Sequence, residues 1–275
     1  MTNENRDPEP PADKYPVEAR PPLHAPKVHT MGLGHIPLTA LVTGSVSFIY
    51  AVAFHLGTAP PVASMAMLVA LYILAAIVPS PHRLNPETDA APAKLTTGTR
   101  FTIVRVAVAC MLGGIAALPS GTPPVEALLW SLTAFGLAAA LLEATDNWLA
   151  RITGSVSSFS ERLSVMTGSF FAFALALLPL QLGLIGPWVL AAGVFGFADA
   201  AISPRGPKGE IPPWQIWSRL AQRVALLAIL VPWMPLWART ILAGAAILIA
   251  LGHVIHALQT RISAAKQQNR PISDA

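Results

Sequence analysis

Residues 163–184 read LSVMTGSFFAFALALLPLQLGL and contain no Asp, Glu, Lys or Arg. A transmembrane helix needs about 20 consecutive apolar residues, so this stretch is long enough to cross a bilayer. The whole chain has the same character, because 53% of its 275 residues are hydrophobic and only 12% are charged. Soluble domains have about 45–50% apolar and about 25% charged residues. The composition therefore predicts an all-α, polytopic membrane helix bundle.

Seven further apolar runs accompany this one. Together the candidate spans are 37–56, 62–78, 101–118, 127–142 with a polar extension to 149, 163–184, 186–198, 224–237 and 241–257. The sixth and seventh runs are short for a hydrocarbon core of about 30 Å, so we expect eight spans and keep seven as the alternative. Pro232 and Pro235 obscure the seventh run, because proline kinks or ends a helix.

Eight spans divide the loops between two sides of the membrane, and these sides differ in their number of Lys and Arg residues. All Lys and Arg residues except Arg239, which is 17 of the 18, fall on the side of both termini. Cytoplasmic loops of membrane proteins are enriched in Lys and Arg, so both termini and loops 79–100, 150–162 and 199–223 are predicted to be cytoplasmic. This distribution explains the net charge of +4 without a nucleic-acid partner. We expect an integral protein of a bacterial-type inner membrane, with membrane lipid as its partner.

The ends of the chain differ from its middle. Residues 1–36 are rich in Pro and have no apolar core, which predicts a disordered cytoplasmic tail. Residues 263–275 form a second predicted tail, and residues 37–79 hold the first two helices. Cys110 is the single cysteine and lies inside an apolar run. It permits neither an internal disulfide nor a cysteine metal cluster, and we expect it in the core.

The fourth apolar run ends in a cluster of ionisable residues, EATDNWLAR at positions 143–151. On a helix, Glu143, Asp146 and Ala150 share one face. Two carboxylates placed in this way are able to hold a divalent cation through their oxygens. The alternative is an interfacial ion pair between one of the acids and Arg105 or Arg151. Spacing alone favours the ion pair, because acids near the end of a membrane helix reach water at little cost.

The residues that follow extend this cluster into a longer pattern. After Arg151 come eight residues, 152–159, then Ser160, and Ser164 and Gly168 follow at intervals of four. The pattern resembles the signature of the CDP-alcohol phosphatidyltransferase family, Asp-x2-Asp-Gly-x2-Ala-Arg-x8-Gly-x3-Asp-x3-Asp. Upstream, FTIVR at 101–105 resembles the Leu-Thr-x-x-Arg that opens the first core helix of the family. The resemblance covers residues 98–262 as a six-helix domain, so the first two helices are an addition.

The resemblance implies a transferase of phospholipid biosynthesis. Family members bind a CDP-linked donor at the cytoplasmic face, transfer its substituted phosphate to an alcohol and release CMP. The first three aspartates hold two divalent metals, Mg²⁺ or Mn²⁺, and the fourth activates the acceptor hydroxyl. The metals neutralise the charge that develops and align the attacking and leaving oxygens. The resemblance also implies a homodimer.

Carried over position by position, the signature is kept in its first half and altered in its second. The implied metal ligands are Glu143, in place of the first aspartate, and Asp146, with Glu161 as a substitute ligand one turn before position 164. The implied substrate-binding set, in which Asn147 and Ser160 replace the two glycines, is Arg105, Asn147, Ala150, Arg151 and Ser160.

The two remaining aspartates are lost, because Ser164 and Gly168 stand in their places. A hydroxyl ligates divalent metals far more weakly than a carboxylate, and glycine cannot take a proton, so no residue is assigned as catalytic. Two functions follow as expectations: a phosphotransferase with a depleted metal site, or an inactive relative that binds a lipid or nucleotide or serves as a scaffold. As an alternative to chemistry, Ser160, Ser164, Gly168 and Ala172 form a small-residue stripe that predicts close helix packing.

Three other features are weaker. Asp199, at the end of the sixth run, is a further candidate acid to replace a lost aspartate. Residues 203–220, with Trp214 and Trp217, predict an aromatic and basic anchor at the membrane interface. A transporter with Glu143, Asp146 and Arg105 along its pathway is a third class of function, but no inverted repeat is visible in the sequence.

Overall fold

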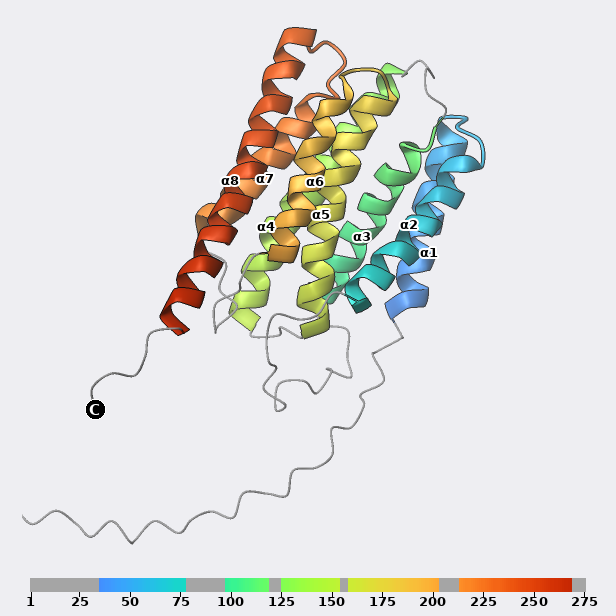
Figure 1. Ribbon diagram of the computed structural model, residues 1–275. Helices are drawn as coiled ribbons and strands as arrows, with labels where there is room; N and C mark the ends of the chain where they lie inside the picture. Colours follow the sequence, from blue (N-terminus) through green and yellow to red (C-terminus); the bar gives the residue numbers. More distant parts are fainter. Residues whose placement is uncertain (1–34, 78–96, 119–124, 154–157, 203–212, 269–275) are drawn as a thin grey trace, which may run out of the picture.

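The computed structural model describes residues 35–77, 97–118, 125–153, 158–202 and 213–268. Every regular element in these ranges is helical, and the chain forms an elongated bundle (Figure 1). Its elements are α1 (His35–Ala53), α2 (Ala59–Ile77), α3 (Thr97–Ile115), α4 (Glu126–Thr153), α5 (Ser158–Gln181), the 3₁₀ turn η2 (Pro187–Val189), α6 (Leu190–Ile202), α7 (Pro213–Ala228) and α8 (Leu236–Gln268).

The bundle has the composition of a membrane-embedded protein. Four helices contain a segment that is long and apolar enough to cross a bilayer, namely Ile36–Ala53, Glu126–Glu143, Leu163–Gln181 and Leu236–Ser263. Shorter apolar helices cover Ala59–Leu74, Phe101–Ile115 and Pro187–Ile202. The predicted all-α membrane bundle is confirmed at this level.

The stretch at 163–184 forms the central helix, α5. Its apolar segment is 72% buried inside the protein, whereas those of α1 and α8 are only 28% buried. It packs against α2, α3, α6 and α7. The contact with α6 is close, because a Cβ atom on Gly193 would lie 2.7 Å from the Cα of Phe173. Cys110 on α3 is fully buried, as predicted.

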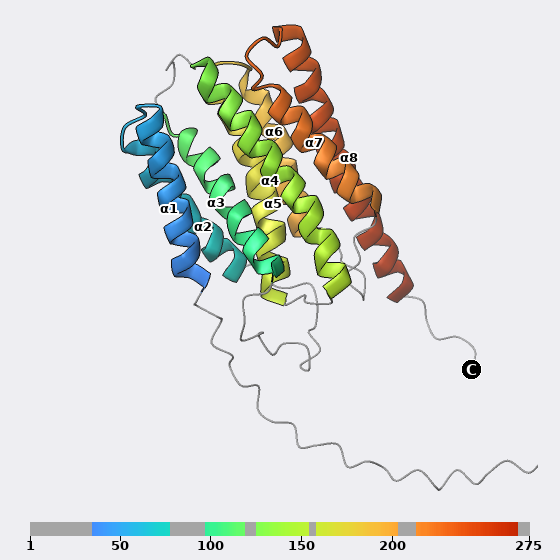
Figure 2. The ribbon, with the colours of Figure 1, turned by 180° about the vertical axis from the view of Figure 1, so that it is seen from behind.

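The two N-terminal helices lie on one flank of the bundle and α7 and α8 on the other, in both views (Figures 1 and 2). Both α1 and α2 pack against α3. A Cβ atom on Gly114 of α3 would overlap the hydroxyl of Ser64 and lie 2.5 Å from the carbonyl oxygen of Pro60. Tyr72 of α2 also donates a 3.0 Å hydrogen bond to Thr39 of α1. The N-terminal pair is therefore packed tightly onto the remaining helices.

The seventh helix does not lie where the sequence predicts it. The predicted span 224–237 is wrong, because α7 begins at Pro213, inside the predicted loop 199–223, and ends at Ala228. Its polar residues Arg219, Gln222 and Arg223 recur at helical spacing and point into the bundle, where Gln222 and Arg223 are buried. Apolar Trp217 is 68% exposed on the outside. A search for apolar runs misses such a helix, because its charges are on the inner face.

Candidate functional site

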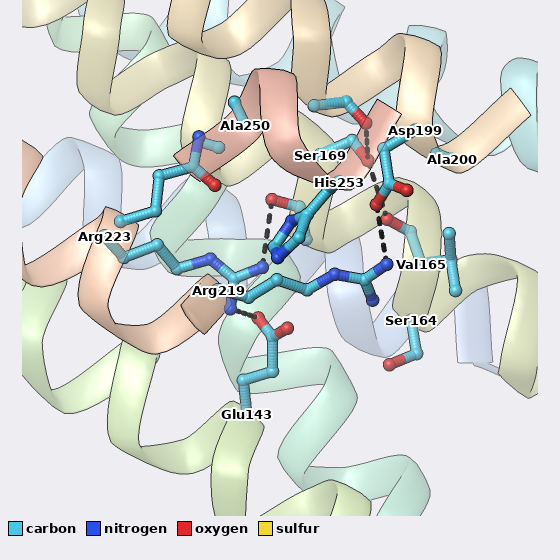
Figure 3. Close-up of a pocket in the computed structure, with 14 residues that line it drawn as sticks. Glu143, Ser164, Val165, Ser169, Asp199, Ala200, Arg219, Arg223, Ala250 and His253 are labelled. Atoms are coloured by element: carbon cyan, nitrogen blue, oxygen red, sulfur yellow. Dashed lines mark hydrogen bonds and ion pairs between the residues drawn. The ribbon is translucent and has the colours of Figure 1, made fainter. Parts of the chain in front are cut away.

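A small cavity lies between α5, α6, α7 and α8, with Glu143 of α4 at its edge (Figure 3). Its volume is about 40 Å³. A buried water needs about 10–15 Å³, so the cavity has room for a few water molecules or one small group, and not for a nucleotide. The polar residues that line it are Glu143, Ser164, Ser169, Asp199, Arg219, Gln222, Arg223 and His253.

Glu143 is held by two arginines from neighbouring helices. Its Oε2 lies 2.6 Å from Nη2 of Arg105 on α3 and also forms an ion pair with Nη1 of Arg223 on α7. All three residues are buried. A buried charge is costly unless an opposite charge and hydrogen bonds compensate it, which explains why the three groups converge. The predicted ion pair between Glu143 and Arg105 is confirmed, and Arg223 is a further partner that the sequence does not reveal.

Ser164 and Gly168, at the positions of the lost aspartates, both contact this cluster. Arg105 donates a 3.2 Å hydrogen bond from Nη1 to the hydroxyl of Ser164, and Arg223 donates one of 3.4 Å from Nη2 to the carbonyl oxygen of Gly168. A Cβ atom on Gly168 would lie only 2.9 Å from Nη2 of Arg223. The predicted small-residue packing seam is therefore wrong at these two positions, because they make room for charged side chains.

A second ion pair lies on the far side of the cavity. Nη2 of Arg219 is 2.6 Å from Oδ2 of Asp199, which is buried at the end of α6. Asp199 therefore already has a cationic partner and is poorly placed to replace a lost metal ligand. On α8, Nε2 of His253 shares a 2.6 Å hydrogen bond with the hydroxyl of Ser218. Trp214 packs edge-on against His256, with ring centroids 4.9 Å apart, so this predicted interfacial tryptophan contacts α8.

The other predicted site residues lie at the ends of α4 and α5. The backbone of each is helical, but the side chains lie outside the described part of the structure for Asp146, Asn147, Ala150, Arg151, Ser160 and Glu161. Glu143 is thus the one predicted metal ligand whose side chain is described. Around it, α4 packs against α3 and α7, and α5 packs against the same two helices.

The described side chains do not fit the Mg²⁺ or Mn²⁺ that the resemblance implies. Among them there is no group of three His, Cys, Asp or Glu residues able to hold a metal ion. A divalent cation at Glu143 would face two guanidinium groups, and repulsion between like charges is strong away from water. The cluster is instead rich in N–H donors, which suit an anionic group better than a cation.

Comparisons of the chain with family models, with curated proteins and with solved structures find no match.

Proposed function

We propose that this protein is a polytopic membrane protein of the CDP-alcohol phosphotransferase type in which ion pairs stand in place of the metal centre. It binds a lipid or nucleotide, or serves as a scaffold, and does not act as a transferase. The proposal combines the family-like pattern at 143–168 with the surroundings of Glu143. In the family the first aspartate is a metal ligand, whereas Glu143 is neutralised by Arg105 and Arg223.

One observation carries this proposal most directly. In the signature, position 168 is the aspartate that activates the acceptor. Here it is a glycine, and the guanidinium of Arg223 lies within 2.9 Å of the site where a Cβ atom would be. The same guanidinium neutralises Glu143. The replacement at 168 and the ion pair at 143 are therefore linked, because the missing side chain leaves the space that Arg223 uses.

We further propose eight spans with both termini in the cytoplasm of a bacterial-type inner membrane. The start of α1 and the end of α8 lie at the same end of the bundle (Figure 1). On α8, no Asp, Glu, Lys or Arg occurs between Arg239 and Arg261. This interval is about 33 Å long at 1.5 Å per residue, close to the thickness of the hydrocarbon core. Exposed Trp233 and Trp237 precede it, as expected for an interfacial aromatic belt.

The test is release of CMP from CDP-diacylglycerol by the purified, full-length protein in lipid vesicles with Mg²⁺ or Mn²⁺ and a panel of alcohols. An active CDP-alcohol phosphotransferase in the same vesicles is the positive control. We expect no release above that of protein-free vesicles. Release that Asp146→Asn abolishes would overturn the proposal and establish the alternative, a working transferase with a depleted metal site.

A further inference from the structure

We propose that the cavity between α5, α6, α7 and α8 is a metal-independent site for one phosphate group, bound by Arg219 and Arg223. This inference rests on the proposed binding function and names the chemistry that the site recognises. The phosphate belongs to a lipid headgroup or is free inorganic phosphate, and both present the same tetrahedral oxyanion. Four features support this site: the geometry of the two arginines, their unused donors, the net charge and the volume of the cavity.

The two arginines are four residues apart on α7, so their side chains leave the same face of the helix one turn apart. Figure 3 shows both guanidinium groups directed into the cavity. The side chain of Arg223 is 6% exposed and that of Arg219 is 20% exposed. Arg223 therefore forms the deep part of the site, and Arg219 lies nearer the surface, where a ligand enters.

Each guanidinium has donors that the described residues do not use. Arg223 directs Nη1 to Glu143 and Nη2 to the carbonyl oxygen of Gly168, while its buried Nε has no hydrogen-bond partner within the described residues. Arg219 directs Nη2 to Asp199. A guanidinium carries five N–H groups in a planar fork that matches the oxygens of a phosphate. Ser164 accepts a hydrogen bond from Arg105, so its own O–H remains able to donate.

The charges around the cavity favour an anion. The described charged groups that face it or hold its residues are three arginines, at 105, 219 and 223, and two carboxylates, Glu143 and Asp199. Both carboxylates are already paired with arginine. The formal charges of these five groups sum to +1. A buried positive charge is stabilised by a nearby negative charge, so a phosphate oxyanion complements the cluster without a metal ion.

The volume limits the ligand to a single phosphate group. The cavity of about 40 Å³ has room for roughly three waters, which is comparable with one tetrahedral oxyanion. A whole nucleotide would need a pocket of about 300 Å³ or more. Any larger molecule is therefore bound by its phosphate alone, with the remainder outside the cavity.

The test measures binding of radiolabelled inorganic phosphate, and separately of nanodiscs containing phosphatidic acid or only phosphatidylcholine, to the full-length protein in EDTA. We expect saturable binding without metal. Arg219→Gln should weaken it about tenfold or more, because a charge-assisted hydrogen bond is lost. Asp199→Asn should tighten it several-fold, because it releases Nη2 of Arg219 and removes a negative charge. Arg261→Gln removes a surface cation outside the cavity and should change nothing.

The outcomes distinguish the two possible sources of the phosphate, and they distinguish failure of this inference from failure of the proposed function. Binding of inorganic phosphate that competes with phosphatidic acid assigns a shared site, whereas binding of phosphatidic acid alone assigns a lipid headgroup. The inference is overturned if binding requires Mg²⁺, if Arg219→Gln and Arg261→Gln weaken it equally, or if the wild type binds neither probe. In those cases an absence of CMP release still supports the proposed function, and CMP release overturns that function whatever the phosphate result.

Discussion

Gly168 shows how one residue determines what its neighbours can do. The absence of a side chain at this position lets Arg223 approach the carbonyl oxygen of α5 and neutralise Glu143 at the same time. Arg105 completes the cluster from the other side. The missing side chain at position 168 thereby leaves the space in which Arg223 pairs with Glu143, and a side chain there should disturb this pair.

Gly168→Ala should lower stability, because its new Cβ would lie 2.9 Å from Nη2 of Arg223 and force the guanidinium away from Glu143. Because the guanidinium is the far end of a flexible side chain and can shift, the cost should be at the low end, about 1 kcal/mol, of the cost of adding a methyl group to a packed site. The measurement is the thermal unfolding midpoint of purified protein in detergent.

Gly244→Ala on α8 is the matched control for this substitution. Apart from the neighbouring backbone of α8 itself, no heavy atom of the described residues lies within 4 Å of the position that its Cβ would occupy. Alanine is favoured over glycine in a helix by up to about 1 kcal/mol, so this variant should be as stable as the wild type or slightly more stable. Equal effects of the two substitutions would contradict the close contact between Gly168 and Arg223.

At the scale of the element, the sequence predicts most helices well and one poorly. Runs such as 163–184 are apolar throughout, so their composition alone marks them. The polar extension of the fourth run is helical, and α4 continues to Thr153. The sequence does not reveal α7, because apolar Trp217 and Val224 are exposed on the outside while Arg219 and Arg223 face other helices. Its position depends on partners distant in sequence, Glu143 and Asp199, which no local pattern reveals.

The same reasoning explains what the sequence shows of the site. Glu143 and Arg105 stand out as ionisable residues in apolar surroundings, and the sequence offers them as partners beside Asp146 and Arg151; the structure pairs Glu143 with Arg105. Arg223 falls in a segment that reads as a loop, so its role becomes visible only in three dimensions.

The contact between α2 and α3 gives a prediction at this scale. Gly114→Ala should destabilise the protein by about 1–3 kcal/mol or more, because its Cβ would overlap Ser64 and lie 2.5 Å from the backbone oxygen of Pro60. Backbone cannot move aside as a flexible side chain can, so α2 must shift away from α3. Thermal unfolding in detergent measures the loss, and Gly252→Ala, which has open space around it, is the control. A stability equal to that of the control would mean that α2 and α3 are not closely packed.

For the whole molecule, the proposed topology places the two ends of α8 on opposite sides of the membrane. In a Cys110→Ala background, a cysteine introduced at Trp237 should react with a membrane-impermeant maleimide in intact cells, because this exposed residue is assigned to the outer interface. A cysteine at Ser263 should react only after the cells are opened. Labelling of both sites in intact cells would contradict an α8 that spans the membrane with a cytoplasmic end.

The inward-facing charges of α7 also have a consequence for how the protein is made. A central arginine disfavours insertion of an isolated helix by about 2.5–3.5 kcal/mol, and α7 carries both Arg219 and Arg223. On the proposed topology, α7 therefore enters the bilayer only with help from α4 and α6, which supply Glu143 and Asp199 and are synthesised before it. The order of synthesis therefore matters on this topology, because two earlier helices supply the carboxylates that stabilise the arginines of a later helix in the bilayer.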